Sequence, residues 1–163
     1  MARLTLRTIL LVTIAAMAVP IPAHEPSAPA SAHAELPAVA RGAAAVVDSF
    51  HAALHRGDTA AAAALLADDA LIFEGGGVER SKAEYVGHHL PADAAFSREV
   101  TSIVTRRSGN AFGNLAWVAS EGKATGAYKG KALNLVTAET MVLRRAGRGW
   151  KILHVHWSSA AKP

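Results

Sequence analysis

The chain has 163 residues, with 17 Lys and Arg, 13 Asp and Glu, and no cysteine. This length suffices for one domain with its own core, and the lack of cysteine excludes disulfides, thiolate nucleophiles, iron–sulfur clusters and cysteine-ligated zinc. The basic residues are scattered and are not interleaved with aromatic ones, so nucleic acid is not an expected partner.

Residues 1–23 have the features of a secretory signal peptide. Arg3 and Arg7 precede an apolar run, and small residues follow at two alternative cleavage positions, Ala18 and Ala23. The run is shorter than the roughly 20 residues of a stable bilayer-spanning helix, and no cysteine follows it to carry a lipid anchor. We therefore expect a periplasmic or secreted protein without a stable membrane anchor; a retained anchor is the alternative.

The composition of residues 24–38 predicts a flexible linker, because this segment is rich in Pro, Ala and Ser and contains almost no large apolar side chain. Such a segment cannot bury enough surface to offset the entropy of ordering it. If His24 became the amino terminus, it could bind copper weakly together with His33. A disordered polar tail explains the same residues more simply, and no cofactor is expected.

Helical periodicity begins at Ala38 and ends at Gly57, a natural left-handed C-cap. Asp58 is a suitable N-cap for a second helix over 59–66, which Asp68-Asp69 would break. An apolar strand over 70–74 leads into three glycines, which form a turn and lack the Lys-Ser/Thr of a phosphate-binding loop. Ser81 and Glu84 form a capping box that opens a short helix, and Pro91 is expected to end it.

The remaining sequence predicts strands over 98–106, 112–120, 124–128, 133–144 and 150–158, with turns at 109–110, 129–131 and 147–149. In the longest of these, alternate residues share one face. They are Leu133, Leu135, Thr137, Glu139, Met141 and Leu143. Helices followed by antiparallel hairpins indicate an α+β domain, and the absence of β-α-β alternation argues against a Rossmann-type parallel sheet.

This order of elements resembles the nuclear-transport-factor-2-like superfamily, most closely its SnoaL-like branch, and is also similar to the association domain of calmodulin-dependent kinase. The most specific parts are the terminal strand Trp150–Ser158 and the helix from Glu84-Tyr85 into His88-His89-Leu90. The resemblance implies a SnoaL-like domain over 39–160, with a cone-shaped, curved mixed or antiparallel sheet wrapped around N-terminal helices. It also implies a pocket at the cone's open end and, in many members, a homodimer through the outer sheet face.

Members of this superfamily include isomerases, cyclases, dehydratases and domains without catalysis, so the fold does not fix the function. We expect a small, partly apolar molecule to bind in the cone. An enzyme of isomerase, cyclase or hydrolase type that uses His and a carboxylate is one alternative, and a homo-oligomeric interaction domain is another. The predicted pocket consists of large aromatic or apolar side chains and histidines: Phe50, Leu54, Phe73, Tyr85, His88, His89, Trp117, His154, His156 and Trp157.

His154 and His156 share one face of the last strand because they are two residues apart. The sequence does not decide whether that face points into the cone or outward, and a hydrogen-bonded or interface role is an alternative to a pocket role. Together with His88 or His89 they could supply the three imidazoles of a zinc or copper site. Three carboxylates lie near apolar runs without an assignable partner: Glu74, Asp93 and Glu99.

Overall fold

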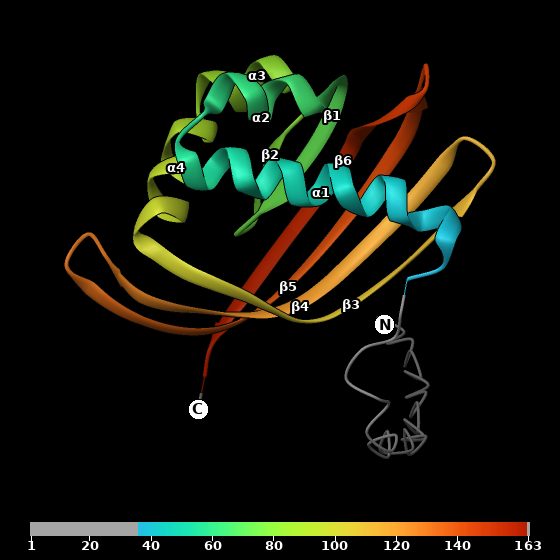
Figure 1. The fold of residues 1–163 in the computed structure, drawn as a ribbon. Coiled ribbons are helices and arrows are strands. Elements are labelled where there is room, and N and C mark those ends of the chain that lie inside the picture. Colours follow the sequence, from blue (N-terminus) through green and yellow to red (C-terminus); the bar gives the residue numbers. More distant parts are fainter. Residues whose placement is uncertain (1–35, 163) are drawn as a thin grey trace, which may run out of the picture.

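The computed structural model describes residues 36–162, so the predicted signal peptide and residues 24–35 of the linker lie outside the described residues. Four helices cover one face of a curved six-stranded sheet (Figure 1). The helices are α1 (Ala38–Arg56), α2 (Thr59–Leu65), α3 (Lys82–Gly87) and α4 (Leu90–Glu99). The strands are β1 (Leu66–Glu74), β2 (Gly77–Glu79), β3 (Val100–Phe112), β4 (Leu115–Tyr128), β5 (Lys131–Ala146) and β6 (Gly149–Ala161).

The strand order is β2-β1-β6-β5-β4-β3, and all neighbours are antiparallel except β1 and β6, which are parallel. This arrangement confirms the predicted α+β class with a curved mixed sheet around N-terminal helices. No helix within residues 36–162 is long and apolar enough to cross a membrane.

Helix α1 lies across the concave face of the sheet and supplies much of the core (Figure 1). Its apolar stripe, which includes Val47 and Phe50, is fully buried against the sheet. The helix ends as predicted at Gly57, whose φ of 73° suits a residue without a Cβ. Asp58 then caps α2 by accepting a hydrogen bond from the backbone nitrogen of Ala61 at 3.0 Å.

Pro91 lies in the first turn of a helix, contrary to the prediction that it ends one. Helix α3 stops at Gly87, and α4 starts at Leu90 with Pro91 in its first turn. A proline is tolerated there because the first backbone N–H groups of a helix have no intrahelical acceptor. The sequence 82–99 therefore forms two short helices instead of one.

Gly109 lies within β3, contrary to the predicted turn at 109–110. The strand continues to Phe112, and the chain turns at Gly113, whose φ is 59°. A Cβ at Gly109 would approach the carbonyl oxygen of Trp117 to 2.8 Å, so the glycine permits a close approach of β3 and β4. The two strands predicted over 112–120 and 124–128 are likewise one continuous strand, β4.

A β-bulge at Leu153 changes the face on which the end of β6 presents its side chains. Leu143 of β5 pairs with Ile152, whereas its neighbour Val142 pairs with His154, which leaves Leu153 as the extra residue. Ile152 and Val155 consequently both face the core and are fully buried. His154 lies on the opposite, outer face, although it is two residues from Ile152.

Candidate active site on the concave face

A row of mostly polar residues crosses the concave face at the edge of the packed core. One residue from each of five adjacent strands is in register, and we call these five the polar row: Arg107, Ser120, Glu139, Trp157 and Glu74. The neighbouring row on one side belongs to the packed core. Its members are Gly109 and four buried residues, Val118, Met141, Val155 and Ile72.

The row on the other side is more open. It consists of Val104, Gly122, Thr137 and Ser159, and Val104 is 51% exposed. We call these four residues the open floor. The polar row therefore stands where the core that α1 covers gives way to accessible, mostly small side chains. This is the position at which a small molecule could touch both polar groups and apolar surface.

Glu139 is the most constrained member of the polar row. Trp157 Nε1 donates a hydrogen bond to Glu139 Oε2 at 2.7 Å, and His51 Nε2 lies 2.6 Å from the same oxygen. The Glu139 side chain is only 9% exposed, whereas that of His51 is 40% exposed. Among residues 36–162, the buried Oε1 of Glu139 has no hydrogen-bond partner.

Opposing effects set the pKa of Glu139. Burial alone would raise it, but the hydrogen bond and charge of His51, the Trp157 hydrogen bond and the charge of Arg107 together hold the pKa below its usual value. The Glu139 carboxyl is therefore an anion at neutral pH. Its charge can compensate a positive charge on the His51 ring, as a carboxylate does in other histidine–carboxylate pairs.

Arg107 fastens α1 to the far end of the polar row. Its Nε donates to Ser120 Oγ at 3.2 Å, and a terminal guanidinium nitrogen donates to Asp48 Oδ1 at 2.5 Å. Asp48 and His51 are three residues apart on α1 and so project from the same side of the helix. The Arg107–Asp48 and Glu139–His51 contacts therefore both hold this side of α1 against the sheet.

A second group of titratable side chains lies at the Glu74 end of the row. Tyr85 is completely buried, and its hydroxyl donates to Asp93 Oδ2 at 2.6 Å. Burial raises the pKa of Asp93, an effect that the Tyr85 hydrogen bond and the charge of His89 oppose. Burial also raises the pKa of the Tyr85 phenol, with the nearby Asp93 adding to the shift, so Tyr85 remains a hydrogen-bond donor.

Glu74 titrates close to neutral pH. Glu74 as a residue is exposed to solvent at the end of β1, but neighbouring protein atoms desolvate its carboxyl, and the charge of Asp93 adds a smaller repulsion. These effects raise the pKa of Glu74 to about 7. Carboxyl groups with a pKa near the working pH are suited to general acid–base catalysis, because both protonation states are populated.

The ten side chains predicted to line a pocket fall into three places. Four lie on the helix-covered side of the sheet: Phe50, Leu54, Tyr85 and Trp157. Trp157 stacks on Phe50 with ring centroids 6.3 Å apart. Four lie on the outer face: Phe73, Trp117, His154 and His156. Phe73 makes edge contacts with both of these histidines.

The other two, His88 and His89, are exposed at the junction of α3 and α4. His89 Nδ1 pairs with the buried Glu79. His154 Nδ1 lies 2.8 Å from the carbonyl oxygen of Leu71, on the face of the sheet opposite the helices. The three-imidazole set therefore does not form, and within residues 36–162 no group of three or more His, Cys, Asp or Glu side chains could hold a metal ion.

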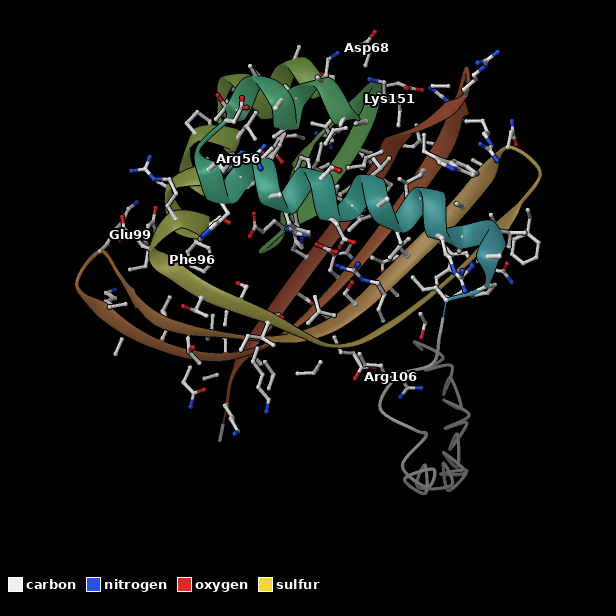
Figure 2. The ribbon with its side chains drawn as sticks, in the orientation of Figure 1. Arg56, Asp68, Phe96, Glu99, Arg106 and Lys151 are labelled. Atoms are coloured by element: carbon white, nitrogen blue, oxygen red, sulfur yellow. The ribbon has the colours of Figure 1, made fainter. Side chains whose placement is uncertain are left out.

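Glu74 and Asp93 were candidates from the sequence, whereas His51, Arg107, Ser120 and Glu139 were not predicted as parts of a site. The available signal was Glu139 itself, a carboxylate in phase with Leu135, Met141 and Leu143 on a mostly apolar strand face. Buried carboxylates are almost always paired, so that position indicated a partner. The partner is on α1, and no local pattern connects it to β5. Glu99, the third carboxylate considered, is exposed at the end of α4 (Figure 2).

An open cleft of about 370 Å³ lies at the opposite end of β1 and β6, where Figure 2 labels Asp68 and Lys151. Each of its cationic side chains already has a partner. Lys82 pairs with Asp68, Lys151 donates to the carbonyl oxygen of Ala64, and Arg144 donates to both carboxylate oxygens of Asp69 at 3.0 and 2.8 Å. The cleft therefore offers no unpaired charge to a ligand.

A family model described as a SnoaL-like domain matches residues 43–162. A solved structure from Shewanella frigidimarina, named as a candidate ketosteroid isomerase, is 42% identical over 76% of this chain and 100% of that chain, with a TM-score of 0.71. A candidate calcium/calmodulin-dependent protein kinase II association domain from Xanthomonas campestris is 25% identical over 80% of this chain and 94% of that chain, with a TM-score of 0.64.

A third structure shows likeness in fold alone. It is a candidate dehydratase of the nuclear-transport-factor-2-like family from Streptomyces avermitilis, 18% identical over 76% of this chain and 98% of that chain, with a TM-score of 0.65. No curated protein sequence is significantly similar to the chain. The predicted resemblance is thus confirmed: the chain belongs to the SnoaL-like branch of the nuclear-transport-factor-2-like superfamily.

Proposed function

We propose that this protein is an acid–base enzyme that transfers protons on a small, partly apolar molecule bound over the polar row. The observation that carries the proposal is the contrast between two carboxyl groups on either side of Trp157. The pKa of Glu74 is raised to about 7, whereas the pKa of Glu139 is held below its usual value. Paired carboxyls whose environments separate their pKa values in this way are typical of sites that divide acid and base roles.

Glu74 is the proposed base. Its ionised form takes a proton from a carbon next to a carbonyl group, and its protonated form returns the proton. The buried Tyr85–Asp93 pair keeps Asp93 beside Glu74 and thereby contributes to the raised pKa. The 42% identical structure named as a candidate ketosteroid isomerase supports this class of proton transfer.

The expected substrate is uncharged. Glu139 is held as an anion, and Arg107, the cationic member of the row, is already paired with Asp48, so the row offers an anionic molecule no unpaired positive charge. The open floor supplies small and apolar contacts through Val104, Gly122 and Thr137. These features favour a neutral ketone with a compact hydrocarbon frame.

The test uses NMR to measure how fast the α-protons of 3-hydroxycyclohexanone and of other neutral cyclic ketones exchange in deuterated water. Exchange accelerated by the wild-type protein and reduced at least about 100-fold by Glu74→Gln would support the proposal. Glu99→Gln is the matched control, because Glu99 is an exposed carboxylate outside the row (Figure 2). If the wild-type protein binds these ketones without exchanging their protons, the site is a binding site and not an enzyme.

We also propose that the protein is an exported homodimer. The charged start and apolar run of residues 1–23 support export, and amino-terminal sequencing of the mature protein should begin at Val19 or His24. The outer sheet face supports the dimer, because it exposes several large apolar side chains. They are Ile103, Phe112, Leu115, Trp117 and Val136. Exposed apolar surface of more than a few hundred Å² usually marks an interface.

A further inference from the structure

The outer face of the sheet carries two histidines side by side on one strand. His154 and His156 follow the bulge of β6 and are two residues apart, so both project from the outer face about 7 Å apart along the strand. The ring of Phe73 on β1 contacts both, with its centroid 5.2 Å from that of His154 and 6.2 Å from that of His156. The two imidazoles are therefore gathered around one aromatic side chain.

Each imidazole has a nitrogen without a hydrogen-bond partner among residues 36–162. His154 Nδ1 lies 2.8 Å from the carbonyl oxygen of Leu71. Because a carbonyl oxygen only accepts hydrogen bonds, Nδ1 carries the hydrogen and Nε2 keeps its lone pair. A histidine that binds a metal through one ring nitrogen commonly donates the other to a backbone carbonyl in this way. His156 is exposed, and its ring makes no hydrogen bond within the described part of the chain.

We propose that His154 and His156 from two copies of the chain together bind one Zn²⁺ ion at the outer sheet face. This inference rests on the proposed homodimer, because each copy supplies only two ligands. Within residues 36–162 no third His, Asp or Glu side chain completes a metal-binding group. Structural zinc sites are tetrahedral and have four protein ligands, and two imidazoles from each copy supply that number.

The position of the pair in the sheet suits a site shared by two copies. Strands β6 and β5 are the two central strands of the six, so a twofold axis through the middle of the outer face passes close to the histidines. In a twofold interface, residues near the axis meet their own counterparts in the other copy. His154 is also in one cross-strand row with Val142 and Trp117, so the pair shares its face with the exposed apolar side chains.

The immediate surroundings of the two histidines suit a bound cation. Their cross-strand neighbours are Val142 and Thr140 on β5 and Leu71 and Phe73 on β1. None of these four side chains is charged, so no fixed positive charge next to the pair repels the ion. Packing against Phe73 alone would be served equally by other aromatic rings, whereas metal binding requires the imidazole nitrogens.

The experiment measures zinc binding and self-association of the full chain, purified without an affinity tag and treated with EDTA. Equilibrium dialysis against Zn²⁺ should give one ion per two chains. Sedimentation equilibrium should show that Zn²⁺ tightens the dimer at least about tenfold, because an ion that binds only the dimer stabilises it by mass action. Co²⁺ in place of Zn²⁺ should give the intense visible absorption of a tetrahedral site and not the weak absorption of an octahedral ion.

Two variants remove the proposed ligands. His154→Gln/His156→Gln should bind no zinc at the interface, and its dimer should not respond to zinc. His156→Gln loses no hydrogen bond within residues 36–162, so it keeps the test valid if the double variant does not fold; it should weaken zinc binding at least about tenfold. His55→Gln/His88→Gln is the matched control, since these two exposed histidines lie on the helical side, and it should behave as the wild type.

The outcomes separate the zinc site from the dimer. Zinc that binds equally well to the wild type and to both ligand variants, or that binds one ion per chain without changing the dimer, would overturn the inference. A wild-type dimer that binds no zinc would overturn it while leaving the proposed homodimer intact. A wild-type protein that stays monomeric both with and without zinc would overturn both.

Discussion

Glu74 and Glu139 stand on opposite sides of Trp157 in one cross-strand row, and their surroundings displace their pKa values in opposite directions. Desolvation of its carboxyl by neighbouring protein atoms, with no cationic partner among residues 36–162, favours the protonated form of Glu74. Two hydrogen bonds to one oxygen favour the ionised form of Glu139. The same residue type thus has a raised pKa at one position of the row and a lowered pKa at the other because its surroundings differ.

The pH dependence of α-proton exchange should report the ionisation of Glu74. Because the base must be ionised, the exchange rate should increase as the pH rises through about 7 and should level off above it. In Asp93→Asn the midpoint should move to lower pH, since the repulsion from Asp93 is removed, but burial should still keep it above the ordinary glutamate value. A midpoint that does not move in this variant would contradict the placement of Asp93 beside Glu74.

Glu74 should lower the stability of the fold at alkaline pH. Its pKa is raised from 4.5 in the unfolded chain to about 7 in the fold, so its contribution is fully favourable below about 4.5 and is lost as the pH rises through about 7. Glu74→Gln should therefore stabilise the protein at pH 8 by about 1–2 kcal/mol, allowing for solvent screening of this partly exposed group. Urea denaturation at pH 8 and at pH 4.5 measures the difference, which should be absent at the lower pH.

Trp157→Phe should isolate the hydrogen bond to Glu139. The new ring can still stack on Phe50, but it has no N–H donor, so the buried carboxylate keeps only the His51 bond. We expect a loss of about 1–2 kcal/mol in the free energy of unfolding. Trp117→Phe is the control, because within residues 36–162 the indole N–H of Trp117 has no hydrogen bond; its effect should be below about 0.5 kcal/mol. Equal losses in the two variants would show that ring size, and not the bond, matters.

Gly109→Ala should destabilise the protein because the new Cβ would approach the carbonyl oxygen of Trp117 to 2.8 Å. The oxygen belongs to the backbone of the paired strand β4, which cannot move aside without disturbing the β3–β4 hydrogen bonds, and overpacking of this kind costs about 1–3 kcal/mol. Gly87→Ala is a suitable control, since a Cβ there has no described atom within 4 Å and the backbone is not left-handed. Thermal denaturation of both variants checks the prediction, which fails if their midpoints agree.

The proposed homodimer should depend on the outer face. Trp117→Lys places a charge among the exposed apolar side chains of that face and should convert the dimer to a monomer in light scattering at micromolar concentration. Val86→Lys changes an equally exposed apolar side chain on α3, on the helical side, and should leave the dimer intact. A monomeric wild-type protein would refute the dimer.

Local patterns predicted the elements that local chemistry determines. The α1 stripe, the Gly57 cap and the Asp58 cap are confirmed, because each depends on residues within one or two turns. The prediction that Pro91 ends a helix was wrong, because a proline is compatible both with the first turn of a helix and with the residues that follow a helix. The predicted turn at 109–110 was wrong, because the glycine at 109 is required by the close approach of Trp117 on the next strand, which the local sequence does not reveal.

The site was harder to predict than the fold because its partners are distant in sequence. His51 and Glu139 come from the first helix and the fifth strand, and the packing of α1 against the concave face of the sheet brings them together. The bulge at Leu153 further hid which side chains of β6 point inward. Strict alternation groups His154 with Ile152, whereas the extra residue places His154 on the outer face and Trp157 beside Glu139.

The layering of rows on the concave face separates the charged side chains from the packed ones. The polar row draws a single residue from each of five strands, and the adjacent buried row carries the packing. The charges and the packing are therefore carried largely by different rows of side chains. They meet at Trp157, whose ring stacks on Phe50 while its N–H binds Glu139, so this position is the one at which a change in the polar row reaches directly into the core.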